Sequence, residues 1–198
     1  MSQPYFETVK SFADVPITDD GVDTAAFLEA SDGLITMFDL FGSAVFGFVQ
    51  NDLKTNLGGV RDKYNAARDR SPTLEKLVAA EAAEGHRYAT ACLVRFVRGL
   101  LFTLRALQHT QTDQHAELHT CFKRAYDDVL RHHHNWAVRS VVSLAILAVP
   151  SRTSFFTHLA QGGAPDKLHA ALALWLAGLE NVVGRVRGFL EGGGYGKV

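Results

Sequence analysis

The sequence predicts an all-α fold of about eight helices, and three observations support this. Apolar residues recur with the 3.6-residue period of a helix along most of the 198 residues. No segment alternates convincingly with the two-residue period of a strand. Proline, glycine and short polar clusters separate the periodic segments, at Pro16, 69–72, Pro150, 162–165 and 192–194. With no internal repeat and no low-complexity tract, residues 1–198 are expected to form a single domain.

The predicted helices follow one another with short breaks. Asp23 and Thr24 open the first, and its apolar positions suit a buried face: Phe27, Leu28, Leu34, Ile35, Phe38 and Phe41. The second covers about 45–67, and an alanine-rich third follows Pro72. The remaining helices are expected over 88–109, 113–131, 135–149 and 151–159, with a long last one from Pro165.

Composition excludes several classes of protein. The formal net charge is −1, so the chain lacks the overall basic field that holds nucleic acid. Cys92 and Cys121 form no CxxC pair and no disulfide ladder, which favours a reducing compartment. The N-terminal stretch has no apolar signal-peptide core, and no apolar run reaches the roughly 18 residues of a membrane span. We therefore expect a cytoplasmic protein.

Two features are unusual for an ordinary helical bundle. Phenylalanine occurs 13 times, and four copies crowd one helix junction: Phe38, Phe41, Phe46 and Phe48. The segments 136–149 and 168–183 are apolar nearly all round, as in helices that lie mid-fold or line an apolar cavity. Composition alone favours a filled core over a cavity, and Trp175 in the second segment is expected in the core.

Catalytic and metal motifs are absent from the sequence. His132, His133 and His134 would point about 100° apart on a helix, so they cannot converge on one ion. The chain has no HExxH or Glu-x-x-His pair, no GxSxG elbow and no phosphate loop. We therefore expect no metal, no cofactor and no enzymatic activity, with one histidine turned inward and the others in solvent. A helical enzyme using His134 as base and Asp52 as its orienter is the alternative.

The segment NDLKTNLGG, residues 51–59, follows the apolar run AVFGFVQ. Asp52 and Asn56 are four residues apart, so they share one helical face. This position could place a carboxylate at the rim of a hydrophobic region. On spacing alone, a structural ion pair of Asp52 with Arg98 or Lys54 is equally compatible.

Four segments in order resemble the glycolipid transfer protein superfamily: FLEASDGLITMFDLFGS (27–43), NDLKTNLGGVRDKY (51–64), LVRFVRGLLF (93–102) and HNWAVRSVVSLAILAVPSRTSFF (134–156). The terminal YGKV is also similar to that family's terminus. The resemblance implies a two-layer all-α sandwich that encloses a hydrophobic lipid tunnel. It also implies transfer of single sphingolipids between membranes without ATP and without catalysis.

The resemblance further implies roles for individual residues. Asp52 would accept a hydrogen bond from the ceramide amide N–H, and His134 would donate one to the amide carbonyl. Trp136 would contact the membrane or pack beside the site. The residues expected to line the tail tunnel are Phe38, Phe41, Phe46, Phe48, Leu100, Phe102, Val141, Leu144 and Leu147. The expected partners are one sphingolipid and a transiently contacted membrane surface, for a monomer that binds no nucleic acid.

Two residues point to different headgroups. The glycolipid-binding branch carries asparagine, lysine and tryptophan at positions 56, 59 and 95, where this chain has Asn56, Gly59 and Arg95. The branch that carries ceramide-1-phosphate has arginine at 95 and 91 and lysine at 56, and here position 91 is Ala91. Asn56 thus favours a sugar and Arg95 a phosphate. We expect a glycosylceramide-type glycolipid, with ceramide-1-phosphate transfer and a sphingolipid sensor as alternatives.

Overall fold

The structure, a computed structural model, describes residues 2–41 and 44–198, and the side chains of residues 41–46 lie outside its description. It confirms the predicted all-α class. The helices of this part of the chain are α1 Tyr5–Thr8, α2 Thr24–Met37, α3 Ala44–Ala66, α4 Leu74–Ala83, α5 Tyr88–Thr112, α6 Leu118–Val129, α7 Trp136–Leu147, α8 Arg152–Ala160 and α9 Pro165–Gly192. Short 3₁₀ turns cover Phe12–Asp14 (η1), Phe38–Phe41 (η2), Arg68–Arg70 (η3) and Arg131–His133 (η4).

The helix boundaries follow the local sequence signals closely. Asp23 caps α2 by accepting from the backbone N–H of Ala26 at 2.8 Å, and Pro165 is the first residue of α9. The helix expected from residue 113 begins only at Leu118. Its first residues form a turn instead, because the carboxylate of Asp113 accepts from the backbone N–H groups of His115 and Ala116.

Three small elements, two strands and one short helix, were not predicted from the sequence. Strands β1 Ile17–Thr18 and β2 Gly21–Val22 pair antiparallel, with Ile17 opposite Val22. They and the four-residue α1 are too short to produce a detectable period. The hairpin is joined to the helices through Glu75, whose carboxylate accepts from the Val22 N–H at 2.9 Å and pairs with Arg185 at 3.0 Å.

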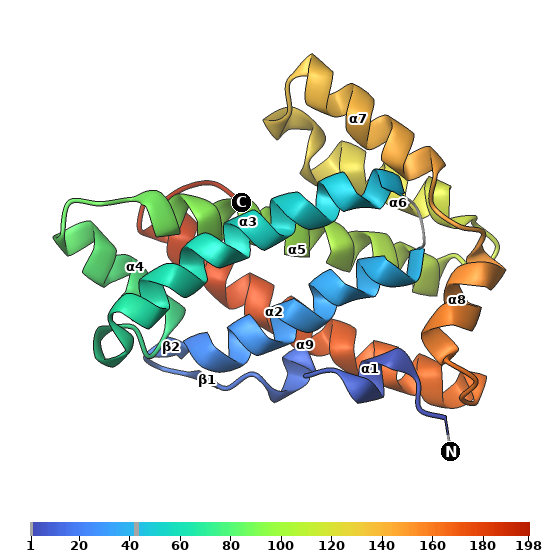
Figure 1. The fold of residues 1–198 in the computed structure, drawn as a ribbon, viewed down its shortest axis with the longest axis horizontal. Helices are drawn as coiled ribbons and strands as arrows, with labels where there is room; N and C mark the ends of the chain where they lie inside the picture. Colours follow the sequence, from blue (N-terminus) through green and yellow to red (C-terminus); the bar gives the residue numbers. More distant parts are fainter. Residues whose placement is uncertain (1, 42–43) are drawn as a thin grey trace.

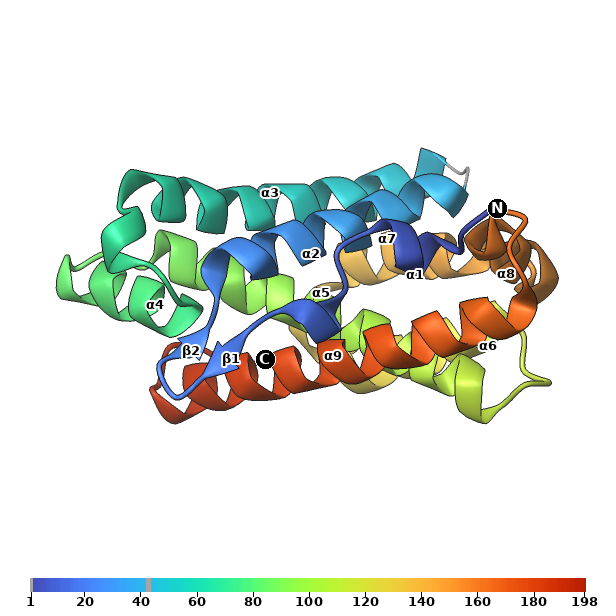
Figure 2. The ribbon, with the colours of Figure 1, turned by 90° about the horizontal axis from the view of Figure 1, so that it is seen from below.

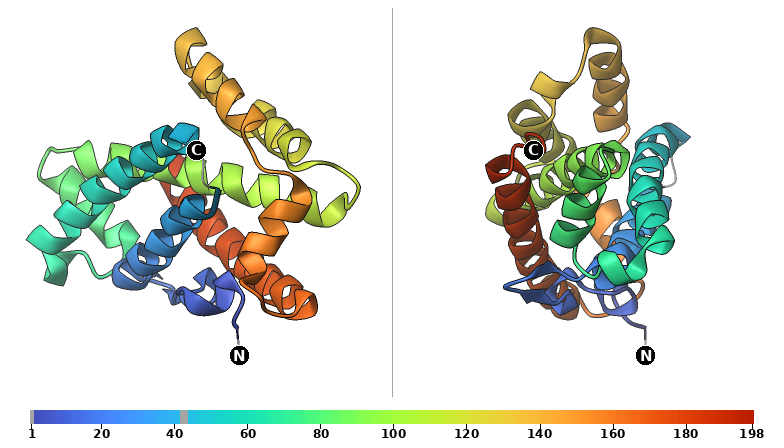
Figure 3. Two further views of the ribbon diagram at one scale, coloured as in Figure 1. Left: turned by 45° about the vertical axis from the view of Figure 1, so that its right-hand side comes forward. Right: turned by 90° about the vertical axis from the view of Figure 1, so that its left-hand side faces the viewer.

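The helices form two layers. Helices α2 and α3 lie side by side in one layer, and α5, α6 and α9 form the other (Figures 1 and 2). Helix α5 is central, because it packs against α3, α6 and α9. Helix α7 stands out from the body next to α6 (Figure 3). No helix of the described chain is by itself long and apolar enough to cross a membrane. Helices α7 and α8 meet that test only as a pair, and they are bent by 76°.

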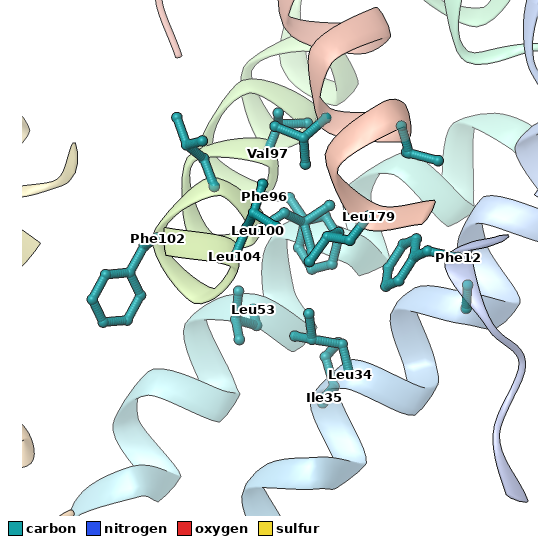
Figure 4. Close-up of a cluster of buried hydrophobic side chains, with 14 of the residues drawn as sticks. Phe12, Leu34, Ile35, Leu53, Phe96, Val97, Leu100, Phe102, Leu104 and Leu179 are labelled. Carbon is teal, nitrogen blue, oxygen red and sulfur yellow. The ribbon is translucent and has the colours of Figure 1, made fainter. Parts of the chain in front are cut away.

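The apolar core fills the space between the layers. Trp175 is 1% exposed and packs against the rings of Phe6 and Phe12, so its predicted core position is confirmed. Figure 4 shows Leu53, Leu100 and their neighbours meeting between α3, α5 and α2. Phe102, from the same helix α5, points away from this cluster in the figure.

Hydrogen bonds anchor helix α5 at its start and again near its middle. At its start, the buried carboxylate of Glu81 accepts from the backbone N–H groups of Ala89 and Thr90 and from the Thr90 hydroxyl. Burial raises the pKa of Glu81, but these hydrogen bonds outweigh it and leave the pKa below its ordinary value. Further along, the guanidinium of Arg98 donates to the carbonyl of Lys197 at 2.9 and 2.6 Å, which holds the C-terminal segment against α5.

Candidate functional site

A pocket of about 310 Å³ opens between α3, α5 and α7. Its polar wall is made by Asp52, Arg95, Arg98, Thr103, His133 and His134. Its apolar wall includes Phe38, Phe48, Leu53, Phe102, Val138 and Val142. A group of polar side chains at the edge of an apolar hollow is the usual composition of a small-molecule site.

Helix geometry explains why α5 supplies so much of this pocket. Arg98 and Gly99 follow Arg95 by three and four residues, and Phe102 follows them by four and three, so the four residues lie on one face of the helix. Gly99 allows α3 to approach this face, because a Cβ there would lie 2.8 Å from the Leu53 side chain. The same close approach brings Asp52, which precedes Leu53 on α3, to the pocket wall.

The structure brings together three of the four residues predicted to contact the headgroup and amide. Asp52, Arg95 and His134 all line the pocket, from α3, α5 and the segment before α7. The alternative ion pair of Asp52 with Arg98 or Lys54 is not formed, since Arg98 is engaged with Lys197. Within the described residues, Asp52 has no cationic partner inside 4.0 Å. Its carboxylate is therefore available to a ligand.

His134 is held at the pocket by Tyr126 of α6. The Tyr126 hydroxyl lies 3.3 Å from Nδ1 of His134. Burial lowers the pKa of His134; Arg139, Arg98 and His132 lower it further, against the opposing effect of Asp52. Burial raises the pKa of Tyr126, so the phenol keeps its proton. At neutral pH the imidazole is uncharged, with one nitrogen to donate and one to accept.

His133 corrects the sequence prediction, which left it in solvent with His132. His132 is exposed, but His133 is half-buried and lines the pocket. Its Nε2 atom is buried and has no hydrogen-bond partner in the described structure. Burial lowers the pKa of His133, with Arg98 and the two neighbouring histidines adding to the effect. An unsatisfied polar atom at a pocket wall is a candidate ligand contact.

Asn56 also departs from its prediction. Its side chain is 4% exposed, its Nδ2 atom donates to the backbone carbonyl of Asp52 at 2.9 Å, and it is not among the lining residues. The nearby Gly59 has a steric explanation, because a Cβ there would lie 2.6 Å from Sγ of Cys92 and 3.1 Å from the Tyr88 ring. A long side chain at position 59 would therefore require α5, which carries Cys92 and Tyr88, to move away from α3.

The residues predicted to line a tail tunnel divide into four groups. Phe38, Phe48 and Phe102 line the pocket. Leu100 does not, because it is fully buried in the core, and the side chains of Phe41 and Phe46 lie outside the described residues. Val141, Leu144 and Leu147 are on the outer surface of α7, with exposed fractions of 36%, 62% and 74%. The inward face of α7 instead carries Val138, Val142, Ala145 and Ile146.

Trp136 is 81% exposed. This excludes the predicted alternative in which the indole packs beside the pocket. The membrane-contact hypothesis for Trp136 is compatible with its position at the start of the protruding α7 (Figure 1).

Comparison with known proteins gives consistent matches over most of the chain. The family model "Glycolipid transfer protein (GLTP)" matches residues 22–161. A glycolipid transfer protein from Aureobasidium melanogenum is 37% identical over 187 residues, which cover 94% of this chain and 92% of that protein. The human pleckstrin homology domain-containing family A member 8 is 34% identical over 161 residues, and the match spans 31% of its length.

Solved structures give the same result. The crystal structure of HET-C2, a fungal glycolipid transfer protein, superposes with a TM-score of 0.89 at 36% identity, over 94% of this chain and 96% of that one. A structure of FAPP2, described as selecting simple glycosphingolipids with the GLTP fold, has a TM-score of 0.90 at 28% identity and covers 98% of both chains.

Proposed function

Because the chain belongs to the glycolipid transfer protein family, we propose that it moves single sphingolipids between membranes without catalysing a reaction. The observation that carries the proposal is the position of Asp52 and His134 on the wall of one pocket that is otherwise largely apolar. The two side chains come from different parts of the chain, so their convergence depends on the fold.

Asp52 and His134 suit the two halves of a ceramide amide. Burying an amide costs a few kcal/mol (about 2–7) unless its N–H and its carbonyl both find partners. The Asp52 carboxylate accepts from the amide N–H, and the neutral His134 imidazole donates to the carbonyl. This assignment matches one acceptor and one donor to one amide, and no proton transfer is needed.

The tails explain why a carrier is useful. Each CH₂ exposed to water costs about 0.8 kcal/mol, so two chains with roughly 30 carbons together cost over about 20 kcal/mol. The apolar residues Phe38, Phe48 and Phe102 adjoin the polar wall; Phe38 and Phe102 are buried, whereas Phe48 is 52% exposed. A pocket of about 310 Å³ is at the lower limit for a drug-sized ligand. The tails must therefore enter by separating the two helical layers.

For the headgroup we propose a glycosylceramide-type glycolipid. Arg95 and the unpartnered Nε2 of His133 line the pocket beside Asp52. Sugar hydroxyls, which both donate and accept, satisfy these groups together. Asn56 reaches a sugar only by exchanging its hydrogen bond to the Asp52 carbonyl. Ceramide-1-phosphate is the second candidate, favoured by Arg95, whose guanidinium suits a phosphate.

The test of the headgroup is vesicle-to-vesicle transfer with matched acyl chains. For Arg95→Ala, we expect glucosylceramide or galactosylceramide transfer to fall about three- to tenfold, because one charge-assisted hydrogen bond is lost among several contacts. Arg61→Ala is the control, since Arg61 is on α3 and pairs with Asp32 away from the pocket. If only ceramide-1-phosphate moves and Arg95→Ala abolishes its transfer, the headgroup is a phosphate.

The same assay separates transfer from the other two hypotheses. A sensor binds the lipid but leaves it on the protein, so binding without vesicle-to-vesicle movement would support sensing. An enzyme using His134 and Asp52 alters its substrate, so mass spectrometry of the recovered lipid would show a changed mass. For a carrier, the lipid moves and is recovered unchanged.

Tyr126 is expected to act through His134 as a positioning residue. Its hydroxyl lies 3.3 Å from Nδ1. In the tautomer that we propose, the hydroxyl donates to Nδ1 and the proton is on Nε2, where it serves the ligand carbonyl. We expect Tyr126→Phe to weaken lipid binding about three- to tenfold, because the imidazole loses its preference for this tautomer. Nitrogen NMR of His134 measures the tautomer directly. Equal binding and an unchanged His134 spectrum would contradict this role.

A further inference from the structure

A second pocket, of about 340 Å³, lies between α6 and α7. Its polar wall comes from Lys123, Asp127 and Arg131 on α6 and the turn after it, and from Arg139 on α7. Leu147, near the end of α7, forms part of its apolar side. The described linings of this pocket and of the proposed lipid pocket have no residue in common.

The charge of this pocket is not balanced. Asp127 accepts from Lys123 at 2.6 Å and from Arg131 at 3.0 Å, so one carboxylate serves two cations. Arg139 donates through Nε to the backbone carbonyl of Arg131. Over the described chain, Arg139 has no carboxylate within 4.0 Å. The three cations and one carboxylate leave a surplus of positive charge with free guanidinium donors, which suits an anion.

An exposed apolar strip adjoins this pocket. Trp136, Leu144 and Leu147 are 81%, 62% and 74% exposed, and their spacing along α7 places them on one side of the helix. We call these three residues the α7 ridge. Helix α7 protrudes from the body (Figures 1 and 3), and the exposed fractions of the three side chains place the ridge in contact with solvent. Leu147 belongs to the α7 ridge and also lines the α6–α7 pocket, so the ridge and the pocket form one continuous surface.

This pairing of apolar and cationic groups matches the layered chemistry of a bilayer surface. Exposed Trp and Leu side chains partition into the boundary between headgroups and acyl chains, and nearby Lys and Arg attract anionic headgroups. We propose that the α6–α7 pocket binds the phosphate of an anionic phospholipid while the α7 ridge rests in the same bilayer. The occupant is a lipid in a membrane, because a soluble anion would leave the ridge in water.

A third pocket provides an internal contrast. It contains Arg152, but that guanidinium donates to the backbone carbonyls of Thr110, Asp113 and Ala116. Arg152 therefore has a structural role, whereas Arg139 keeps donors for a ligand. Tyr126 adds a geometric link, because it lines the α6–α7 pocket and its hydroxyl lies 3.3 Å from His134 of the lipid pocket. The bound phosphate would thus lie one side chain away from the transfer site.

The test measures binding of the full chain to vesicles that contain no sphingolipid. Vesicles of phosphatidylcholine alone are compared with vesicles of phosphatidylcholine and phosphatidylglycerol, by co-sedimentation. We expect the chain to prefer the anionic vesicles, and Arg139→Gln to reduce that binding about fivefold, as for one charge lost near an anionic surface. Lys123→Gln is the second variant and is also expected to reduce binding to the anionic vesicles. Leu147→Ser is expected to weaken binding to both kinds of vesicle.

Arg105→Gln is the matched control. Arg105 is exposed, faces Glu180 of α9 and is not among the residues lining the α6–α7 pocket. We expect its effect to stay below about twofold. An equal loss for Arg105→Gln and Arg139→Gln would mean diffuse attraction and would overturn the site, as would equal binding to the two kinds of vesicle.

Inorganic phosphate distinguishes a lipid from a soluble anion. When phosphate replaces chloride at constant ionic strength, we expect vesicle binding to persist. If phosphate at a concentration matched to the accessible lipid phosphate displaces the vesicles, the pocket prefers a soluble anion and the proposal is overturned. The vesicles contain no sphingolipid, so the result is independent of the transfer function. A chain that binds anionic vesicles through Arg139 but transfers no sphingolipid would retain this inference and lose the proposed function.

Discussion

Replacing Asp52 with valine is expected to reduce sphingolipid transfer by at least about tenfold and up to about 100-fold. Valine is similar in volume to aspartate but accepts no hydrogen bond, so the ceramide N–H would enter the pocket without a partner. The exposed position of Asp52 on α3 and its lack of an ion pair with described residues mean that folding should depend little on it. Transfer between vesicles measures the loss, and a denaturant titration measures the free energy of unfolding.

Asp62→Val is the matched control for this prediction. Asp62 is also an exposed carboxylate of α3, but it is not among the residues that line the proposed lipid pocket. We expect its transfer rate to equal that of the unmodified chain. Unchanged transfer in Asp52→Val would show that the amide is not recognised here and would remove the observation on which the proposed function depends.

The largest expected effect on stability is at Gly178 in α9. A Cβ there would lie 2.1 Å from the backbone nitrogen of Ala13 and 2.4 Å from the Phe12 carbonyl carbon. These are backbone atoms of η1, so no rotation of a side chain relieves the overlap. We expect Gly178→Ala to lower the free energy of unfolding by about 3 kcal/mol, measured by denaturant titration.

Gly184 supplies the control within the same helix. A Cβ at Gly184 would meet nothing within 4 Å. Alanine is the better helix former by about 0.5–1 kcal/mol, so Gly184→Ala should raise the free energy of unfolding. If both substitutions had the same effect, the close packing of α9 on η1 would not contribute to stability as the structure indicates.

Much of the fold could be predicted from local patterns. The helices from Thr24 to Gly192 begin and end near their predicted bounds because their caps and breakers act within a few residues. The late start of the helix predicted from residue 113 also has a local cause, since the Asp113 carboxylate accepts from the Ala116 N–H and stabilises a turn. Longer-range features, such as the attachment of the C-terminal segment to Arg98, have no local signal.

Helix α7 marks the limit of periodicity as a guide to the site. Its sequence is apolar nearly all round, so no 3.6-residue pattern distinguishes the inward face from the outward one. The prediction therefore assigned Leu144 and Leu147 to a tunnel, whereas the structure exposes them and turns Val138 and Val142 inward. These two exposed leucines are part of the surface for which we propose membrane contact.

The histidine run shows a similar division. Spacing argued against a shared metal ion, and the resemblance singled out His134, which lines the pocket between α3, α5 and α7. His133 also lines this pocket, because η4 turns the chain between α6 and α7. Likewise, the spacing of Asp52 and Asn56 placed both on one face of α3, but only the tertiary structure decides that Asn56 is buried and Asp52 exposed.

The sequence by itself determined the helices and their order, which depend on neighbours within one or two helical turns. The amide-binding roles of Asp52 and His134 came from the family resemblance and remain a prediction. Only the tertiary structure decided which apolar faces are covered, which polar atoms remain without partners and that Arg139 keeps free donors beside exposed leucines. The physical reason is that burial and charge pairing are set by contacts between helices that are distant in the chain, and one sequence carries no local record of those contacts.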